Sequence, residues 1–286
     1  MDFLRPDTLA EAVEIKANRP DAVPIAGGTD VMVELNFDHR RPAALLDLTR
    51  IPELRQWSAG LRVGAGVPYA RIIDELGAEL PGLAMAARTV GSPQIRNRGT
   101  VGGNLGAASP AGDTHPVLLA SGAVVEVASV RGTRMIPADE FYLGVKKNAL
   151  EQDELIVAVH LEPARGPQQF SKVGTRNAMV IAVCSFAISL FPADKRVGAA
   201  VGSAAPTPRR AREAEEFLAS ALDFSSPKPL LDSVKREFGE LVSRAASPID
   251  DVRGSAAYRK HALAVMARRT LGWAWQELLD GERACA

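Results

Sequence analysis

The stretch that decides the fold lies in the middle of the chain and reads Thr100-Val101-Gly102-Gly103-Asn104. It belongs to a longer segment, from Arg96 to Asp113, that is rich in glycine, serine and asparagine. Such residues bury little surface and lose much entropy on ordering, so contact with a ligand explains them better than a plain connector does. A flexible surface loop would nevertheless have the same composition. Glycine N–H groups can surround a phosphate, Thr100 and Asn104 can donate hydrogen bonds to it, and Asp113 can accept one from a ribose or an adenine.

A second glycine stretch lies near the N-terminus, where Ile25-Ala26-Gly27-Gly28-Thr29-Asp30 follows a short predicted strand at residues 23–25. The glycine pair can build the same kind of phosphate nest, and Thr29 adds a hydroxyl. A Gly-Gly pair after a strand is, however, more often a tight turn. Because a carboxylate beside a phosphate is repulsive, we expect Asp30 to cap the following helix and to point away from the ligand.

Neither stretch is the dinucleotide fingerprint of a parallel Rossmann unit, which needs Gly-x-Gly-x-x-Gly at the start of a helix. The nearest imitation is Gly64-Ala65-Gly66, which runs on to Val67-Pro68 without a third glycine in register. We interpret these glycines as the edge of a strand that another backbone approaches closely.

Local patterns predict an α+β protein. Thr8 and Glu11 form a capping box that begins the first helix. Further strands are predicted at residues 44–48, 61–67, 123–128, 133–136 and 155–161, and further helices at 31–36, 69–80, 83–88 and 114–120, with a loop at 91–110. After a linker at 163–167, strands at 179–190 and 196–202 precede helices at 209–221, 228–246 and 255–279. These elements predict a first domain at 1–165, with subdomains at about 1–55 and 56–165, and a C-terminal domain of a sheet and helices at 170–286.

Composition limits the function classes. The chain has 34 basic and 34 acidic residues, so its net charge indicates neither a nucleic-acid partner nor an anionic membrane. Its longest apolar run, Ala178 to Leu190, is too short to cross a bilayer, and its N-terminus does not read as a signal peptide. We therefore expect a cytoplasmic protein without a transmembrane segment.

The two cysteines, Cys184 and Cys285, cannot supply the four thiolates that an iron–sulfur cluster normally takes. The four histidines show no metal-ligand spacing, so no metal site is predicted. No residue stands out as a catalytic acid or base. Any redox chemistry must use an organic cofactor or a partner's metal.

Taken together and in this order, these stretches resemble the FAD-binding subunits and domains of the molybdenum hydroxylase family, which contains xanthine dehydrogenases, aldehyde oxidases and aerobic carbon monoxide dehydrogenases. The resemblance also rests on Ser109-Pro110, on Glu154-Leu155-Ile156 and on the run from Gly202 to Arg209. It extends from about Phe3 to the last predicted helix. It implies that the first domain is a two-subdomain FAD-binding domain with the cofactor between its subdomains.

The resemblance also implies a set of cofactor contacts. In the family, both glycine stretches clasp the diphosphate, which here assigns Ile25, Ala26, Gly27, Gly28, Thr29, Asp30, Thr100, Val101, Gly102, Gly103, Asn104 and Ser109 to the site. Asp113 would serve the ribose and adenine side, and Ile156 would lie near the flavin ring. Lys172 matches a family lysine near the isoalloxazine, although a solvated strand lysine would have the same sequence.

As a family member, the chain would be an electron-transfer subunit. It would hold FAD non-covalently, since no histidine lies beside Gly27-Gly28. The [2Fe–2S] clusters and the molybdopterin would belong to separate small and large subunits, in a dimer of heterotrimers that passes electrons to an external acceptor. Thr29-Asp30 is nearer to the xanthine, nicotine or aldehyde members than to carbon monoxide dehydrogenases, which tend to have His-Ser there.

Two other functions fit parts of the sequence. A stand-alone flavin oxidase has a related FAD fold, but many such enzymes attach FAD through a histidine and carry a separate substrate domain. A non-catalytic FAD-binding scaffold would use the cofactor only to hold its shape. The cofactors that copurify with the chain would separate these hypotheses.

Overall fold

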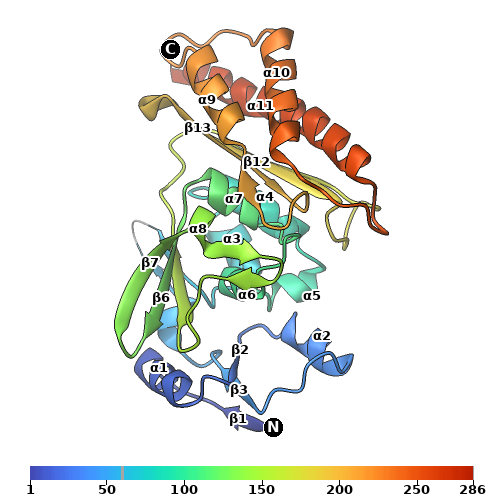
Figure 1. Cartoon of the computed structure of the whole chain (residues 1–286). Helices are drawn as coiled ribbons and strands as arrows, with labels where there is room; N and C mark the ends of the chain where they lie inside the picture. The colour runs from blue at the N-terminus through green and yellow to red at the C-terminus, as the bar shows by residue number, and fades with distance from the viewer. Residues whose placement is uncertain (59–60, 286) are drawn as a thin grey trace.

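The structure, a computed structural model, describes residues 1–58 and 61–285 and shows an α+β fold built on three main sheets. The sheets follow one another along the molecule, with the N-terminal unit at one end and the C-terminal helices at the other (Figure 1). The predicted fold class is confirmed. No helix among the described residues combines the length and apolarity that a membrane crossing requires.

The first unit is a three-stranded parallel sheet of order β1-β3-β2 with two helices. Its central strand β3 is buried at all four positions, as expected for a strand covered on both faces. The Thr8 hydroxyl accepts a hydrogen bond from the Glu11 N–H and begins α1, as predicted. The elements are β1 (Asp2–Leu4), α1 (Leu9–Asn18), β2 (Val23–Ile25), α2 (Val31–Asn36) and β3 (Ala44–Asp47).

The second unit is an antiparallel sheet of order β4-β5-β10-β6-β7, packed with short helices. Its strands are β4 (Trp57–Ser58), β5 (Arg62–Gly64), β6 (Val124–Ser129), β7 (Gly132–Pro137) and β10 (Leu155–His160). Its helices are η1 (Pro52–Arg55), α3 (Tyr69–Glu75), α4 (Pro81–Thr89), α5 (Pro93–Arg96), α6 (Val101–Ala107), α7 (His115–Ala120) and α8 (Ala138–Phe141), and β8 (Tyr142–Gly144) pairs with β9 (Lys147–Asn148) as a hairpin.

The third unit is an antiparallel sheet of order β11-β12-β13-β14 with long helices. Its elements are β11 (Gln168–Val173), β12 (Cys184–Phe191), η2 (Pro192–Asp194), β13 (Arg196–Gly202), β14 (Arg209–Arg210), α9 (Arg212–Ala221), α10 (Asp232–Ala245) and α11 (Ala256–Cys285). The strand predicted at 179–190 starts later than expected, because Met179 has a positive φ of 51° in the turn before β12.

The third sheet is buried on both faces, since α4 packs on β11 and α7 packs on β12 and β13 at one face, while α9 to α11 cover the other (Figure 1). Along β13, Val197 and Val201 point into the core formed with the long helices. Gly198 and Gly202 alternate with them and face α7, where a Cβ on Gly202 would lie 2.6 Å from Cγ of Pro116. The small side chains thus let the sheet pack directly on α7.

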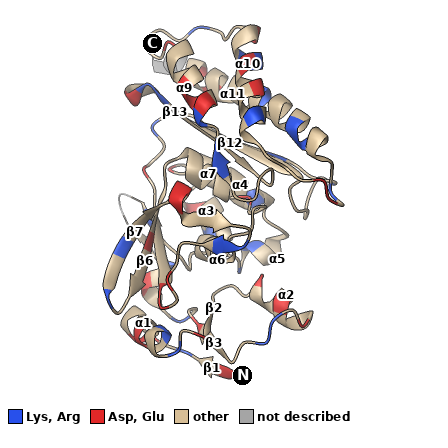
Figure 2. Cartoon of the chain, in the orientation of Figure 1, with Lys and Arg blue, Asp and Glu red and all other residues tan. Residues whose placement is uncertain are grey.

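Charged side chains of both signs are interspersed over all three units (Figure 2). This agrees with the balanced count of 34 basic and 34 acidic residues. The charge distribution therefore does not distinguish one face of the molecule, and the functional site must be located from its cavity and its contacts.

Candidate cofactor site

The two glycine stretches meet in a cleft of about 510 Å³ between the first and second units. This volume is within the usual range for a small-molecule site. Eleven of the predicted contacts line the cleft, namely Ala26, Gly27, Gly28, Thr29, Asp30, Thr100, Gly102, Gly103, Asn104, Ser109 and Ile156. The structure thus brings together segments that are separated by more than a hundred residues in the chain.

Two of these glycines are required by backbone packing. A Cβ on Gly27 would collide with the carbonyl group of Arg98, and a Cβ on Gly102 would lie 2.5 Å from the methyl carbon of Ala65. The Gly102 N–H also donates to the Ala65 carbonyl over 3.1 Å. Gly27 thus lets the first unit pack on the second, and Gly102 lets α6 pack on the segment after β5, so a larger side chain at either position would force these segments apart.

Two other glycines, Gly103 and Gly106, have open space beside them. A Cβ on Gly103 would meet only the Thr100 hydroxyl, at 3.2 Å, and a Cβ on Gly106 would meet only Ile156, at 3.9 Å. Gly28 adopts a φ of +76°, a conformation that other residues rarely take. At these positions a bound phosphate group can approach the backbone closely, and we call them the cradle.

The segment predicted as a loop at residues 91–110 is helical in two places, α5 and α6, so this prediction was wrong. Thr100 has an extended backbone and its hydroxyl accepts a hydrogen bond from the Gly103 N–H at 2.9 Å, which makes Thr100 the N-cap of α6. Glycine has a low helix propensity, and the glycines of α6 therefore led to the prediction of a loop. Val101 points away from the cleft into the core of the second unit.

Thr29 and Asp30 lie at the start of α2. The Thr29 hydroxyl makes no hydrogen bond with any described residue, so it is free to bind a ligand. Asp30 occupies the N-cap position, but its side chain does not cap the helix and its residue is exposed at the cleft. The expectation that Asp30 caps α2 was wrong, because its backbone is helical rather than extended and cannot present the carboxylate to the first turn.

Ile156 forms an apolar wall at the other end of α6. It is 8% exposed on β10, the central strand of the second sheet.

Glu154 directly precedes β10 and also lines the cleft. It accepts two hydrogen bonds from Arg134, at 2.7 and 2.8 Å. The Arg134 guanidinium is the main reason that the pKa of Glu154 lies below its usual range. Glu154 is thus a fixed carboxylate and not a free proton donor.

Asp113 and Lys172 are not among the residues that line the cleft. Their side chains form a buried ion pair, with Nζ of Lys172 2.6 Å from Oδ2 of Asp113, and Thr89 donates to the same oxygen over 2.9 Å. Burial raises the pKa of Asp113 although Lys172 opposes this shift. Lys172 is therefore buried rather than solvated, and the contacts of both residues with a ligand stay predictions. Ile25 also lies outside the lining and packs beneath Gly28.

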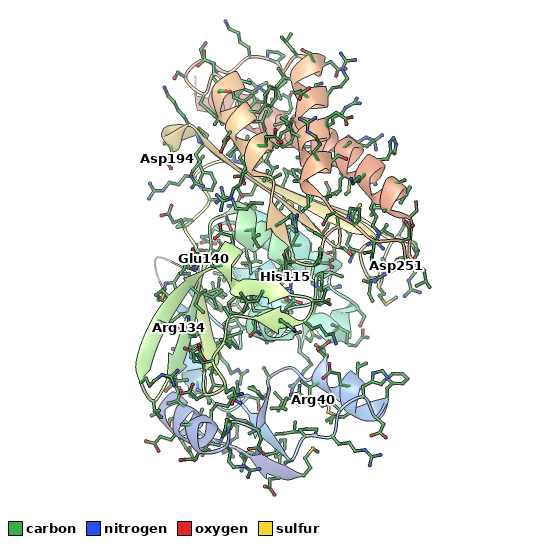
Figure 3. All side chains as sticks on the ribbon, in the orientation of Figure 1. Arg40, His115, Arg134, Glu140, Asp194 and Asp251 are labelled. Atoms are coloured by element: carbon green, nitrogen blue, oxygen red, sulfur yellow. The ribbon has the colours of Figure 1, made fainter. Side chains whose placement is uncertain are left out.

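Sequence reasoning missed a charged group at the mouth of the cleft. Lys146 lies in the β8–β9 turn and pairs with Glu34 of α2 at 3.1 Å. Nη1 of Arg40 lies 3.8 Å from the same carboxylate. Figure 3 shows Arg40 in the first unit. Lys146 has a positive φ of 53° in a turn without glycine at that position, so no local signal indicated its role. The Lys146–Glu34 pair joins the two walls of the cleft.

Comparisons with known proteins agree with this geometry. Residues 1–163 match the family model described as the FAD binding domain in molybdopterin dehydrogenase, and residues 169–274 match the CO dehydrogenase flavoprotein C-terminal domain. The chain is 31% identical over 282 residues to the xanthine dehydrogenase FAD-binding subunit of Escherichia coli O157:H7, with 94% of each chain covered. It is 31% identical over 277 residues to the nicotine 6-hydroxylase medium subunit of Paenarthrobacter nicotinovorans, with 94% of this chain and 95% of the relative covered.

Solved structures agree as well. The CO dehydrogenase from Oligotropha carboxidovorans superposes with a TM-score of 0.89 at 27% identity, over 97% of this chain and 98% of the other. Quinoline 2-oxidoreductase from Pseudomonas putida 86 superposes with a TM-score of 0.87 at 27% identity, over 96% and 97% of the two chains. The predicted family is confirmed: the chain belongs to the FAD-binding flavoproteins of the molybdopterin dehydrogenase family.

Proposed function

We propose that this chain binds FAD non-covalently in the cleft and carries electrons from the [2Fe–2S] clusters of a partner subunit to an external acceptor. The observation that carries this proposal is the meeting of the two glycine stretches across one cleft, with a positive φ at Gly28 and open space beside Gly103 and Gly106. Bound FAD supplies redox chemistry that no side chain of the cleft can provide. The chain's own residues hold the cofactor, orient it and limit its contact with water.

The proposed contacts follow the path of the cleft. The diphosphate would lie against Gly28 and Gly103, where the Thr29 hydroxyl is free to donate a hydrogen bond. The flavin ring would lie at Ile156, against the apolar end of the cleft. The further contacts that we propose are those of the two glycine stretches and Ser109. Because Asp113 and Lys172 lie 2.6 Å apart, we propose that this ion pair contacts one end of the cofactor as a unit.

The chemistry of the lining supports non-covalent binding. The residues that line the cleft in the described part of the chain include neither a histidine nor a cysteine. Cys184 is fully buried in the core of the third unit, and burial raises the pKa of its thiol to about 12. The side chain of Cys285 lies outside the described residues. We therefore expect the flavin to be released when the protein is denatured.

We propose that the rest of the redox chain lies on other subunits. The two cysteines of this sequence cannot ligate even one conventional iron–sulfur cluster. We propose a small iron–sulfur subunit and a large molybdopterin subunit, assembled with this chain as a dimer of heterotrimers in the cytoplasm. Relatives whose names describe them as medium subunits or medium chains support the existence of such partners.

Two experiments test the proposal. Purified chain should be yellow, and acid or heat denaturation should release free FAD into the supernatant. Flavin that stays with the precipitated chain, or a colourless chain that takes up no FAD, would contradict the binding step.

In the coexpressed complex, substrate should bleach the flavin, and removal of FAD should stop turnover with the acceptor while cluster reduction continues. Turnover of the organic substrate by the isolated chain would contradict the electron-transfer role.

A further inference from the structure

The side chain of Asn104 is oriented by residues beneath the floor of the cleft. Its amide nitrogen, Nδ2, donates a hydrogen bond to Oγ1 of Thr114 over 2.9 Å. Thr114 is fully buried, and its hydroxyl also lies 3.4 Å from the hydroxyl of Tyr69. Burial raises the pKa of Tyr69, so its phenol stays neutral and can share a proton with Thr114.

The loop before α7 lies directly against Nδ2 of Asn104. A Cβ on Gly112 would lie 2.9 Å from Nδ2 and would collide with the ring of His115. Figure 3 shows His115 in the middle of the molecule, below the third sheet. Thr114, Tyr69 and Gly112 thus surround Nδ2 on the protein side, and the amide nitrogen is directed away from the cleft.

The oxygen of the same amide is free. Asn104 lines the cleft, and within the described part of the chain its Oδ1 atom neither accepts a hydrogen bond nor is buried without one. An amide oxygen only accepts hydrogen bonds, so it repels a phosphate oxygen and attracts a hydroxyl. The sequence predicted Asn104 as a donor to phosphate, and the orientation of its amide makes it an acceptor at the cleft surface.

Asn104 also lies at an informative place along α6. Gly103 precedes it at the open cradle, and Gly106 follows it beside Ile156. If the diphosphate lies at Gly103 and the flavin ring at Ile156, the segment of FAD between them is the ribityl chain, which carries hydroxyl groups. A hydroxyl donor therefore passes the free oxygen of Asn104.

From this arrangement we infer that Asn104 is an acceptor subsite for a ribityl hydroxyl of FAD and that Thr114 is the positioning residue that keeps its amide in this orientation. The inference rests on the proposed function, because it assumes that FAD occupies the cleft. Thr114 is a suitable residue for a test because its hydroxyl does not cap α7, so its removal leaves the helix start intact.

The test compares FAD with analogues that each lack one ribityl hydroxyl, on the full-length apoprotein. For the wild type, one analogue should bind about three- to tenfold more weakly than FAD, as expected for one neutral hydrogen bond. In Thr114→Val the penalty for that same analogue should disappear, because the amide is free to rotate. Thr114→Ser keeps the hydroxyl and should restore the penalty.

Two further variants separate this effect from a general loss of structure. Thr270→Val removes another fully buried hydroxyl, which lies 2.6 Å from the hydroxyl of Ser171 and on a helix far from Thr114 in the sequence. This variant should keep the wild-type penalty. Asn104→Ala removes the acceptor itself and should abolish the penalty even if Thr114→Val folds poorly. An equal penalty in wild type and Asn104→Ala, or no penalty for any analogue in the wild type, would overturn the inference. A wild-type chain that binds no FAD would overturn the proposed function as well.

Discussion

Nζ of Lys172 lies 2.6 Å from Oδ2 of Asp113, and this pair ties the edge strand of the third sheet to the loop before α7. The two side chains are only 9% and 7% exposed. Oδ1 of Asp113 is buried without a hydrogen-bond partner in the described part of the chain. The carboxylate therefore depends on Lys172 and Thr89 for its stabilisation.

Lys172→Met should destabilise the protein by about 3–5 kcal/mol at neutral pH, because it leaves a buried carboxylate without its cation. Lys172→Met combined with Asp113→Asn should recover much of this loss, since the second change removes the charge. Urea denaturation followed by circular dichroism measures both values. Equal stability of wild type and Lys172→Met would show that the pair contributes nothing.

The stability of Lys172→Met should also fall as pH rises. Burial raises the pKa of Asp113 in the folded state above its ordinary value of 3.8, and loss of Lys172 removes the opposing effect. At pH values between 3.8 and the raised pKa, Asp113 of the folded protein holds a proton that it has lost in the unfolded chain. The free energy of unfolding therefore falls by about 1.4 kcal/mol per pH unit in this range. Denaturation curves from pH 4 to 7 test this. Adding Asp113→Asn should remove the slope, and a persistent slope would assign it to another group.

Gly103→Val should weaken FAD binding strongly while the fold survives. The new side chain would enter the open cradle, and its Cβ would touch only the Thr100 hydroxyl. We expect more than about a tenfold loss of affinity, since overpacking typically costs about 1–3 kcal/mol. The flavin absorbance per chain measures this. Gly272→Val, at a helical glycine in α11 with no atom within 4 Å of a new Cβ, is the matched control and should keep its FAD. Full FAD content in Gly103→Val would place the diphosphate elsewhere.

Gly27→Ala should behave differently, because a Cβ there would collide with the backbone of Arg98 rather than with a ligand. We expect the protein to lose about 1–3 kcal/mol of stability even without cofactor. The melting temperature of the apoprotein distinguishes the two glycine variants: Gly27→Ala should lower it and Gly103→Val should not. An unchanged melting temperature in Gly27→Ala would mean that the two walls can separate freely.

Lys146→Ala should speed the release of FAD, because it breaks the ion pair with Glu34 across the mouth of the cleft. Lys146 is 57% exposed, so the effect should be modest, about two- to fivefold, and should shrink at high salt. Stopped-flow dilution into excess of a flavin trap gives the rate. Lys147→Ala removes the neighbouring exposed lysine, which makes no ion pair within the described residues, and should release FAD at the wild-type rate. A salt-independent increase for Lys146→Ala would argue against the ion pair.

Much of the fold was predictable because its signals are local. The N-cap at Thr8, the strand at residues 23–25 and the helix at 31–36 depend only on neighbouring residues, and the structure has all three, although the Glu11 carboxylate accepts from the Asp7 N–H rather than from Thr8. The helix α6 was not predictable from propensity, because its glycines favour a loop and tertiary contacts such as that of Gly102 with Ala65 help to hold it. The predicted division into domains at residues 165 and 170 stays a prediction.

The sequence predicted which residues form the site but not the separate role of each one. Both glycine stretches carry the same residue type, yet Gly27 and Gly102 serve backbone packing while Gly103 faces open space. This difference depends on Arg98 and Ala65, which lie on other segments. The orientation of the Asn104 amide likewise depends on Thr114, and a sequence pattern does not encode such pairings at a distance.

The contact between Gly27 and Arg98 has a consequence for how the protein forms. Each wall of the cleft belongs to a different segment, and about seventy positions of chain must be closed into a loop before these two residues meet. Such non-local contacts form slowly, because the entropy of loop closure is lost before the contact is gained. We therefore expect the cleft to form late in folding and FAD to bind after the two segments have docked. Bound cofactor should then slow unfolding of the finished subunit without accelerating its folding.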